Sequence, residues 1–145
     1  MKVLDEGGNA IDAAIAVAFA LAVVNPSAGN LGGGGFMLIH LAEKNETTSI
    51  DYRERAPIKA SEKMFQDNSG KIIKGLSLNS ILASAVPGTV SGMFYASEKY
   101  GTKSIKTLIN PSIELARKGF ALSDFQAKNL NKYKKKFSKD KEAKK

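Results

Sequence analysis

The chain has 145 residues, enough for one domain with a modest hydrophobic core, and it contains no cysteine and a single histidine, His40. Disulfides, thiol catalysis, cysteine-ligated zinc and multi-histidine metal sites are therefore excluded. The net charge of +8 would suggest nucleic-acid binding if it were spread over a folded surface, but +7 of it belongs to residues 128–145. We expect this lysine-rich segment to be a solvated helix or tail, with phosphate binding as the alternative.

The first predicted element is a helix over residues 10–24. Asn9 is a suitable N-cap, Asp12 three residues later completes a capping box, and Pro26 ends the helix. Apolar side chains on every face predict that this helix is buried. The apolar run is shorter than the roughly 20 residues of a membrane span, and the acidic residues before it argue against a signal peptide.

A β-hairpin is predicted next, with strands at 36–42 (FMLIHLA) and 47–53 (TTSIDYR) and a polar turn between them. The first strand is apolar on both faces, so we expect layers to cover both sides of its sheet. His40 lies on the face of this strand that also carries Phe36 and Leu38, and we interpret it as a structural residue.

Beyond the hairpin the sequence predicts a connector and then helices. The connector, 54–71, should hold a short helix capped by Ser61 and a turn at "DNSG". Helices are predicted from Pro87 to about 100, from near Pro111 to about 118, and from just after Ser123 into the lysine-rich segment. Glycines at 88 and 92, in the helix predicted from Pro87 to about 100, would let another element pack closely.

The segment "NPSAGNLGGGGF" at 25–36 places four glycines between the first helix and the first strand. Apolar flanks favour a crowded turn over a flexible linker. Nucleotide sites place their glycines after a strand and before a helix, and the order here is the reverse. The sequence thus implies no nucleotide cofactor.

The segment "DYRERAP" gathers charges at the end of the second strand. An arginine in such a position can bind a carboxylate through two parallel hydrogen bonds. The alternative is a structural network of Asp51, Arg53, Glu54 and Arg55 with no ligand, and residue types alone leave both open.

Five segments in unbroken order resemble the large-subunit region of the γ-glutamyltransferases (γ-glutamyltranspeptidases or glutathione hydrolases), over residues 5 to about 128. They are "EGGNAIDAAIAVAFALAVVNPSAGNLGGGGFMLIH", "DYRERAP", "VPGTVSGM", "KYGT" and "PSIELARKGFALS". The resemblance implies an α/β (α+β) fold, part of the αββα sandwich of N-terminal-nucleophile hydrolases: a buried helix plus β-hairpin followed by several helices. Residues 1–127 would then be a partial large-subunit region and residues 128–145 a helical or disordered tail.

The resemblance also implies an activity, namely cleavage of γ-glutamyl amide bonds, as in glutathione, and γ-glutamyl transfer to water, amino acids or peptides. In the family the nucleophile is the N-terminal threonine that autoprocessing exposes on the small subunit, so no catalytic residue, metal or cofactor is expected in this chain. Arg53 matches the arginine of the D-[FY]-R-E motif that binds the γ-glutamyl α-carboxylate, with Asp51 and Glu54 as supporting charges.

The expected partners are glutathione or other γ-glutamyl compounds and the rest of a precursor, including the small subunit, in a heterodimer formed by autoprocessing. Specific nucleic-acid binding, a membrane span and a signal peptide within this chain are not expected. Family members are periplasmic, secreted or at the cell surface. We expect the chain to be inactive alone, and the alternative functions are a non-catalytic glutamate- or glutathione-binding or vestigial module and nucleic-acid binding through the lysine-rich segment.

Overall fold

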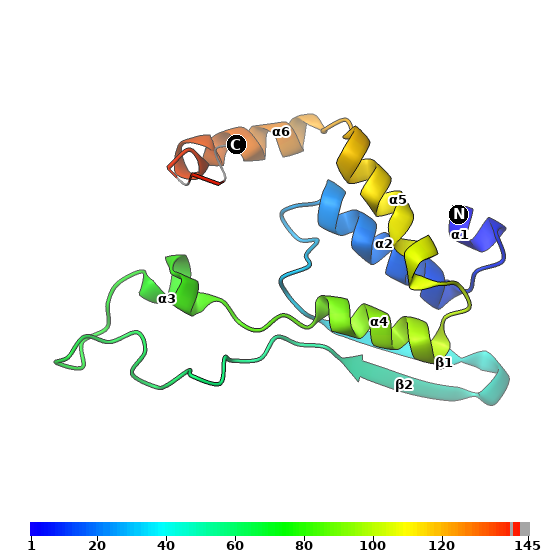
Figure 1. Ribbon diagram of the computed structural model, residues 1–145, viewed down its shortest axis with the longest axis horizontal. Coiled ribbons are helices and arrows are strands. Elements are labelled where there is room, and N and C mark those ends of the chain that lie inside the picture. Colours follow the sequence, from blue (N-terminus) through cyan, green and yellow to red (C-terminus); the bar gives the residue numbers. More distant parts are fainter. Residues whose placement is uncertain (140, 143–145) are drawn as a thin grey trace.

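A layer of helices lies on one face of a two-stranded antiparallel sheet (Figure 1). The computed structural model describes residues 1–139 and 141–142. Its helices and antiparallel hairpin confirm the predicted α/β (α+β) fold. In chain order the elements are α1 (Lys2–Asp5), α2 (Ala10–Val24), β1 (Phe36–Leu41), η1 (Ala42–Lys44), β2 (Glu46–Asp51), α3 (Leu76–Asn79), η2 (Ile81–Ala83), α4 (Thr89–Tyr100), α5 (Ile105–Lys118) and α6 (Asp124–Phe137).

Helix α2 has the predicted bounds. The Asn9 side chain accepts a hydrogen bond from the Asp12 backbone at 2.9 Å, and the Asp12 carboxylate accepts one from the Asn9 backbone at 2.9 Å. This capping box satisfies two amide groups that a helix start would otherwise leave free. The prediction that this helix is buried on every face is wrong within the described residues, because it buries one face while Val17 and Leu21 on its other side are exposed.

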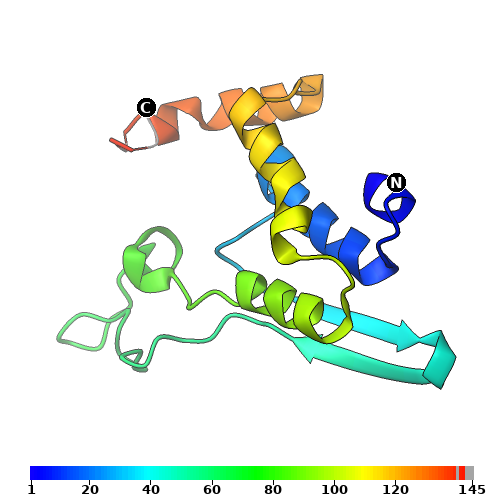
Figure 2. The same cartoon turned by 45° about the vertical axis from the view of Figure 1, so that its right-hand side comes forward.

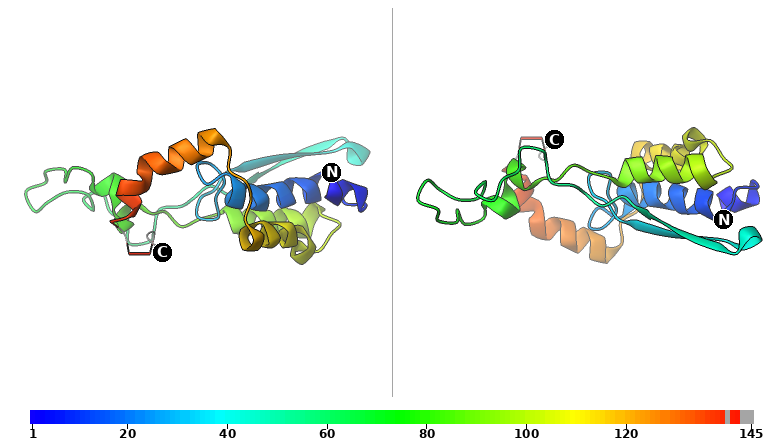
Figure 3. Two further views of the ribbon diagram at one scale, coloured as in Figure 1. Left: turned by 90° about the horizontal axis from the view of Figure 1, so that it is seen from above. Right: turned by 90° about the horizontal axis from the view of Figure 1, so that it is seen from below.

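The hairpin pairs Phe36 with Asp51 and Leu41 with Glu46, and its turn is a 3-10 segment followed by Asn45 in the left-handed conformation (φ 51°). Ile39 is only 5% exposed, while Leu38 is 76% exposed. One face of the sheet is thus covered, by the helices that Figure 3 shows on one side of the hairpin. Among the described residues no second layer covers the opposite face, so the expected two-sided burial of β1 is not found within this chain.

The hydrophobic core lies between three helices, α2, α4 and α5, which Figure 2 shows packed together above the hairpin. Met37, Ile50 and Tyr52 extend this core to the sheet. Because α2 carries apolar residues at helical spacing on this side, it can contact both other helices at once. The buried members are Ile15, Ala16, Phe19, Met93, Ala96 and Leu108.

Three helix predictions need correction. No helix forms after Ser61, where the connector makes successive turns, although the "DNSG" turn is present with Gly70 N donating to Asp67 O at 3.0 Å. Pro87 precedes α4 and its N-cap, Gly88, and so lies outside the first turn. Pro111 lies inside α5, which starts six residues earlier at Ile105, after the N-cap Ser104. Burial of Leu108 against α2 keeps this helix continuous although the proline removes one backbone donor.

Helix α6 begins after Ser123 as predicted, with a capping box to Gln126. The Gln126 amide also donates to the carbonyl of Val24 at 2.7 Å, which ties α6 to the end of α2. The lysine-rich segment is helical up to Phe137, and residues 140 and 143–145 of the predicted tail lie outside the described residues. Nowhere in 1–139 and 141–142 is there a helix long and apolar enough to cross a membrane.

A fully buried carboxylate joins the start of α2 to the loop between α4 and α5. Besides its bond from Asn9, Asp12 accepts hydrogen bonds from the Thr102 hydroxyl at 2.6 Å, the Thr102 backbone at 3.0 Å and the Lys103 backbone at 3.2 Å. Burial alone would raise the pKa of Asp12, but these hydrogen bonds to the charged form outweigh it, so the pKa lies below its ordinary value of 3.8.

We expect Asp12→Asn to lower the free energy of unfolding by about 2–3 kcal/mol at pH 7, because an amide NH₂ would face backbone donors. Since the folded-state pKa is depressed, the wild-type carboxylate stabilises the fold above pH 3.8 and loses this contribution as the pH falls through the folded-state pKa. Urea unfolding at pH 7 and at pH 3 measures both effects. The control Asp5→Asn, an exposed residue of α1, should match the wild type, and equal stability of Asp12→Asn at pH 7 would contradict the assignment.

Candidate functional site

Arg53 lies two residues beyond the end of β2, where the chain leaves the sheet. Its backbone N–H donates to the Asp51 carboxylate at 2.9 Å, and its Nε lies 3.3 Å from Oε2 of Glu54. The Arg53 side chain is 59% exposed and that of Glu54 is 24% exposed. The two carboxylates therefore act on different parts of this arginine: Asp51 fixes its backbone, and Glu54 contacts one edge of its guanidinium.

Two open hollows meet at this arginine. One, of about 590 Å³, is also lined by Gly32, Glu54, the connector positions 56, 57, 60, 64 and 65, and the segment 82–85. The other, of about 500 Å³, is lined by Asp51, Tyr52 and the first turns of α4. Arg53 and Arg55 line both. An exposed guanidinium between two hollows is accessible to an anionic ligand from either side.

The glycine run packs directly against the backbone of residues 52–54. A Cβ at Gly34 would lie 2.7 Å from the Glu54 nitrogen and 2.9 Å from the Arg53 carbonyl carbon, and would overlap the Tyr52 carbonyl oxygen. A Cβ at Gly88, before α4, would overlap the same oxygen. Only residues without side chains permit such an approach of three backbone segments.

Backbone hydrogen bonds hold the three segments together. The carbonyl of Gly33 accepts from Gly88 N at 2.8 Å and from Thr89 N at 3.0 Å. The Asn30 side chain accepts from Gly33 N at 3.0 Å and from the Thr89 hydroxyl at 2.6 Å. The glycine run is thus a fixed turn whose other side is the start of α4, and the crowded-turn interpretation is confirmed.

His40 and Thr47 do not line the hollows at Arg53. Nδ1 of His40 lies 3.0 Å from the Thr47 hydroxyl, across the two strands of the exposed hairpin. This is a hydroxyl–imidazole pair, but no carboxylate among the described residues hydrogen-bonds to the ring, and neither residue lines a hollow described above. Within 1–139 and 141–142 no three His, Cys, Asp or Glu side chains form a group that could hold a metal.

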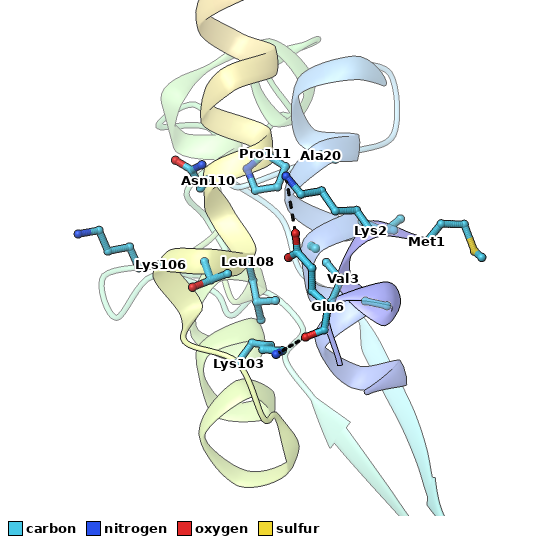
Figure 4. A pocket seen from close by; sticks show the side chains of 14 residues that line it. Met1, Lys2, Val3, Glu6, Ala20, Lys103, Lys106, Leu108, Asn110 and Pro111 are labelled. Atoms are coloured by element: carbon cyan, nitrogen blue, oxygen red, sulfur yellow. Dashed lines mark hydrogen bonds and ion pairs between the residues drawn. The ribbon is translucent and has the colours of Figure 1, made fainter. Parts of the chain in front are cut away.

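A third hollow, of about 580 Å³, lies between α1, α2 and α5 (Figure 4). Its walls are mostly apolar. Its acidic side chain, Glu6, is paired with Lys2 at 3.9 Å, and the backbone carbonyl of Glu6 accepts from the Lys103 ammonium. The Lys103–Glu6 contact joins the end of α1 to the loop before α5, so these polar contacts hold the fold together at the hollow.

The family model of γ-glutamyltranspeptidase matches residues 1–145. This chain belongs to that family. Two relatives named glutathione hydrolase proenzyme, from Pseudomonas sp. (strain A14) and Escherichia coli, are 55% and 51% identical to it over 97% and 92% of its length. The crystal structure of Helicobacter pylori γ-glutamyltranspeptidase is 52% identical with a TM-score of 0.92.

The chain spans about a quarter of the curated relatives that it matches, 24% and 23% of their lengths, and 40% of the Helicobacter pylori chain. That structural match includes 98% of this chain. The prediction that this fold is part of an N-terminal-nucleophile hydrolase is therefore confirmed, as is the predicted family.

Sequence reasoning identified Arg53, Asp51 and Glu54 but missed the residues that hold them. Tyr52 looked like an ordinary strand residue, and Gly88 like a general packing position. The available signal in the sequence was the run of four glycines at 32–35 together with the glycine pair at 88 and 92. No pattern, however, indicates that residues 34, 52 and 88 meet.

We expect Gly34→Ala to lower the free energy of unfolding by about 1–3 kcal/mol, because its methyl group would overlap the backbone of Tyr52–Glu54. Gly32→Ala, two residues earlier in the same run, is the matched control, since a Cβ there meets no atom within 4 Å. Chemical denaturation of both variants measures the difference. Equal stability of the two would show that the glycine run does not support the arginine segment.

Proposed function

We propose that this chain supplies the part of a γ-glutamyltransferase (glutathione hydrolase) that binds the α-carboxylate of the γ-glutamyl group. The whole enzyme would cleave γ-glutamyl amide bonds, as in glutathione, and transfer the γ-glutamyl group to water, amino acids or peptides. The observation that carries this proposal is Arg53 itself: an exposed guanidinium on a supported backbone, in the D-Y-R-E segment of a chain of this family.

The geometry of Arg53 suits a carboxylate ligand. Glu54 contacts Nε, and none of the described residues accepts a hydrogen bond from the two terminal nitrogens. These nitrogens can donate two parallel hydrogen bonds to the two oxygens of one carboxylate. Binding of the α-carboxylate in this way fixes one end of the substrate, which leaves the γ-carbonyl at a set distance for attack.

The chemical step itself requires groups beyond those described here. In the proposed reaction the hydroxyl of an N-terminal threonine adds to the γ-carbonyl of the substrate. The hydroxyl proton passes through the α-amine of the same threonine to the leaving amine, and water or an acceptor amine then cleaves the acyl-enzyme. We place that threonine on the small subunit. The Thr47 hydroxyl is an unsuitable replacement, because it lies on the exposed hairpin beside His40 and not in the hollows that Arg53 lines.

The exposed apolar face of the hairpin supports the proposal that a further part of the precursor covers it. Phe36 and Leu38 are 68% and 76% exposed on the face opposite the helices. The edges of a two-stranded sheet also carry unpaired backbone groups. We propose that the rest of the precursor, including the small subunit, covers this face in a heterodimer, in a periplasmic, secreted or cell-surface enzyme.

A non-catalytic glutamate- or glutathione-binding module is the second candidate. It is favoured by one observation, that the described residues present an exposed arginine but pair no hydroxyl with a base beside it. Inactivity of the isolated chain is expected for both candidates, whereas activity after the chain is combined with the rest of the precursor, including the small subunit, supports the enzyme.

The isolated chain should release no amine from a chromogenic γ-glutamyl anilide above the rate in buffer, because among the described residues no hydroxyl that lines the hollows at Arg53 is hydrogen-bonded to a histidine or carboxylate. The assay is followed by absorbance for hours at high protein concentration. Turnover that Thr47→Ala abolishes would contradict the proposed location of the nucleophile.

The isolated chain should bind glutathione with a dissociation constant on the order of 1 mM, since a single exposed carboxylate contact gives only modest affinity. Arg53→Ala should weaken binding about tenfold or more through loss of two charge-assisted hydrogen bonds. Arg53→Lys should restore only part of it, because an ammonium lacks the parallel donor pair.

Titration followed by NMR chemical shifts measures these constants. Arg117→Ala, which removes a remote exposed arginine of α5, is the control and should bind as the wild type does. A ligand in which the γ-glutamyl α-carboxylate is converted to the amide should not bind. Unchanged binding by Arg53→Ala would overturn the proposed role of this arginine.

A further inference from the structure

We infer that Tyr52 is a positioning residue for Arg53: its ring, wedged between the glycine run and α4, fixes the orientation from which the arginine reaches a ligand. The inference rests on the proposed function, because it assigns a role within that same binding site. In this role Tyr52 does not touch the ligand and acts through Arg53, the next residue in the chain.

The ring of Tyr52 occupies a slot made by two glycines. A Cβ at Gly35 would lie 3.0 Å from the Tyr52 ring carbon Cε2, and a Cβ at Gly92 on α4 would overlap the near side of the ring. The hydroxyl donates to the carbonyl of Phe36 at 3.3 Å. The slot is therefore shaped for a ring, and it closes the ring in from both sides.

The backbone of Tyr52 is held as firmly as its ring. Its N–H donates to the Gly35 carbonyl at 3.0 Å, and its own carbonyl lies against Gly34 and Gly88. One residue further on, the Arg53 N–H is bound by Asp51, and the Arg55 backbone pairs with Val86 in both directions at 3.1 and 2.8 Å. The backbone on both sides of Arg53 is thus fixed, and the side chain of Arg53 has only its own torsions left.

The core transmits this position to the surface. Gly92 lies on α4 next to Met93, which is buried against α2 with Ala96. Movement of the Tyr52 ring toward Gly92 would therefore require α4 to move relative to this core. The orientation of Arg53 is consequently set by the main helical layer instead of by the loop in which it lies.

A preset arginine should bind a carboxylate more tightly than a mobile one. A loop backbone loses conformational freedom when binding orders it, and a backbone that is already fixed avoids that loss. A purely structural tyrosine would also destabilise the fold when removed, so loss of stability cannot distinguish the two roles. The coupling between Tyr52 and Arg53 can.

The test is a double-mutant cycle on glutathione binding by the full chain, followed by NMR. Tyr52→Ala should weaken binding about three- to tenfold when Arg53 is present. In the Arg53→Ala background the same substitution should change the remaining binding less than about twofold, since its effect passes through the arginine. Tyr52→Phe should restore binding to within about twofold of wild type, because the ring fills the slot.

A second readout needs no ligand. The heteronuclear NOE of the Arg53 Nε–H group should fall toward that of a free side chain in Tyr52→Ala, while that of Arg117 stays unchanged. If Tyr52→Ala does not fold, Tyr52→Leu keeps much of the volume without the flat ring and takes its place.

The outcomes separate the two hypotheses. Unchanged glutathione binding by Arg53→Ala would overturn the proposed function itself. Loss of binding in Arg53→Ala, with additive effects of the two substitutions or an unaltered Arg53 NOE in Tyr52→Ala, would leave the proposed function standing and overturn the positioning role.

Discussion

The site depends on the contact of three backbone segments at the carbonyl of Tyr52. Gly34 and Gly88 lie so close to this carbonyl that neither position has room for a methyl group. The turn before β1, the end of β2 and the start of α4 are therefore fixed relative to each other at one point. Arg53 follows that point directly, so its position is a consequence of glycine packing and not of its own contacts alone.

The local signals in the sequence were sufficient for the elements with strong boundaries. The Asn9–Asp12 capping box and Pro26 define α2, and two strand-forming runs on either side of a polar turn define the hairpin. The start of α5 was placed wrongly because a proline was taken as a boundary. In the fold the buried contacts of Leu108 with α2 outweigh one missing hydrogen bond, and such tertiary contacts are not visible in a local pattern.

The candidate site was predictable only in part. Residue types alone left Arg53 as either a ligand contact or a member of a charge network, and the structure shows contacts of Arg53 with Glu54 and Asp51 while its side chain stays exposed. It was the family resemblance that favoured a ligand role. The support from Gly34, Gly88 and Gly92 could not be predicted, because these positions meet Tyr52 through the packing of α4 on the hairpin.

A crystal structure of the chain with bound L-glutamate tests the central claim most directly. We predict that the two α-carboxylate oxygens lie about 2.7–2.9 Å from the two terminal nitrogens of Arg53, with Tyr52 still in its glycine slot. Glutamate bound elsewhere, or an arginine folded onto Glu54 with no ligand beside it, would contradict the claim that this backbone contact presents Arg53 to a γ-glutamyl substrate.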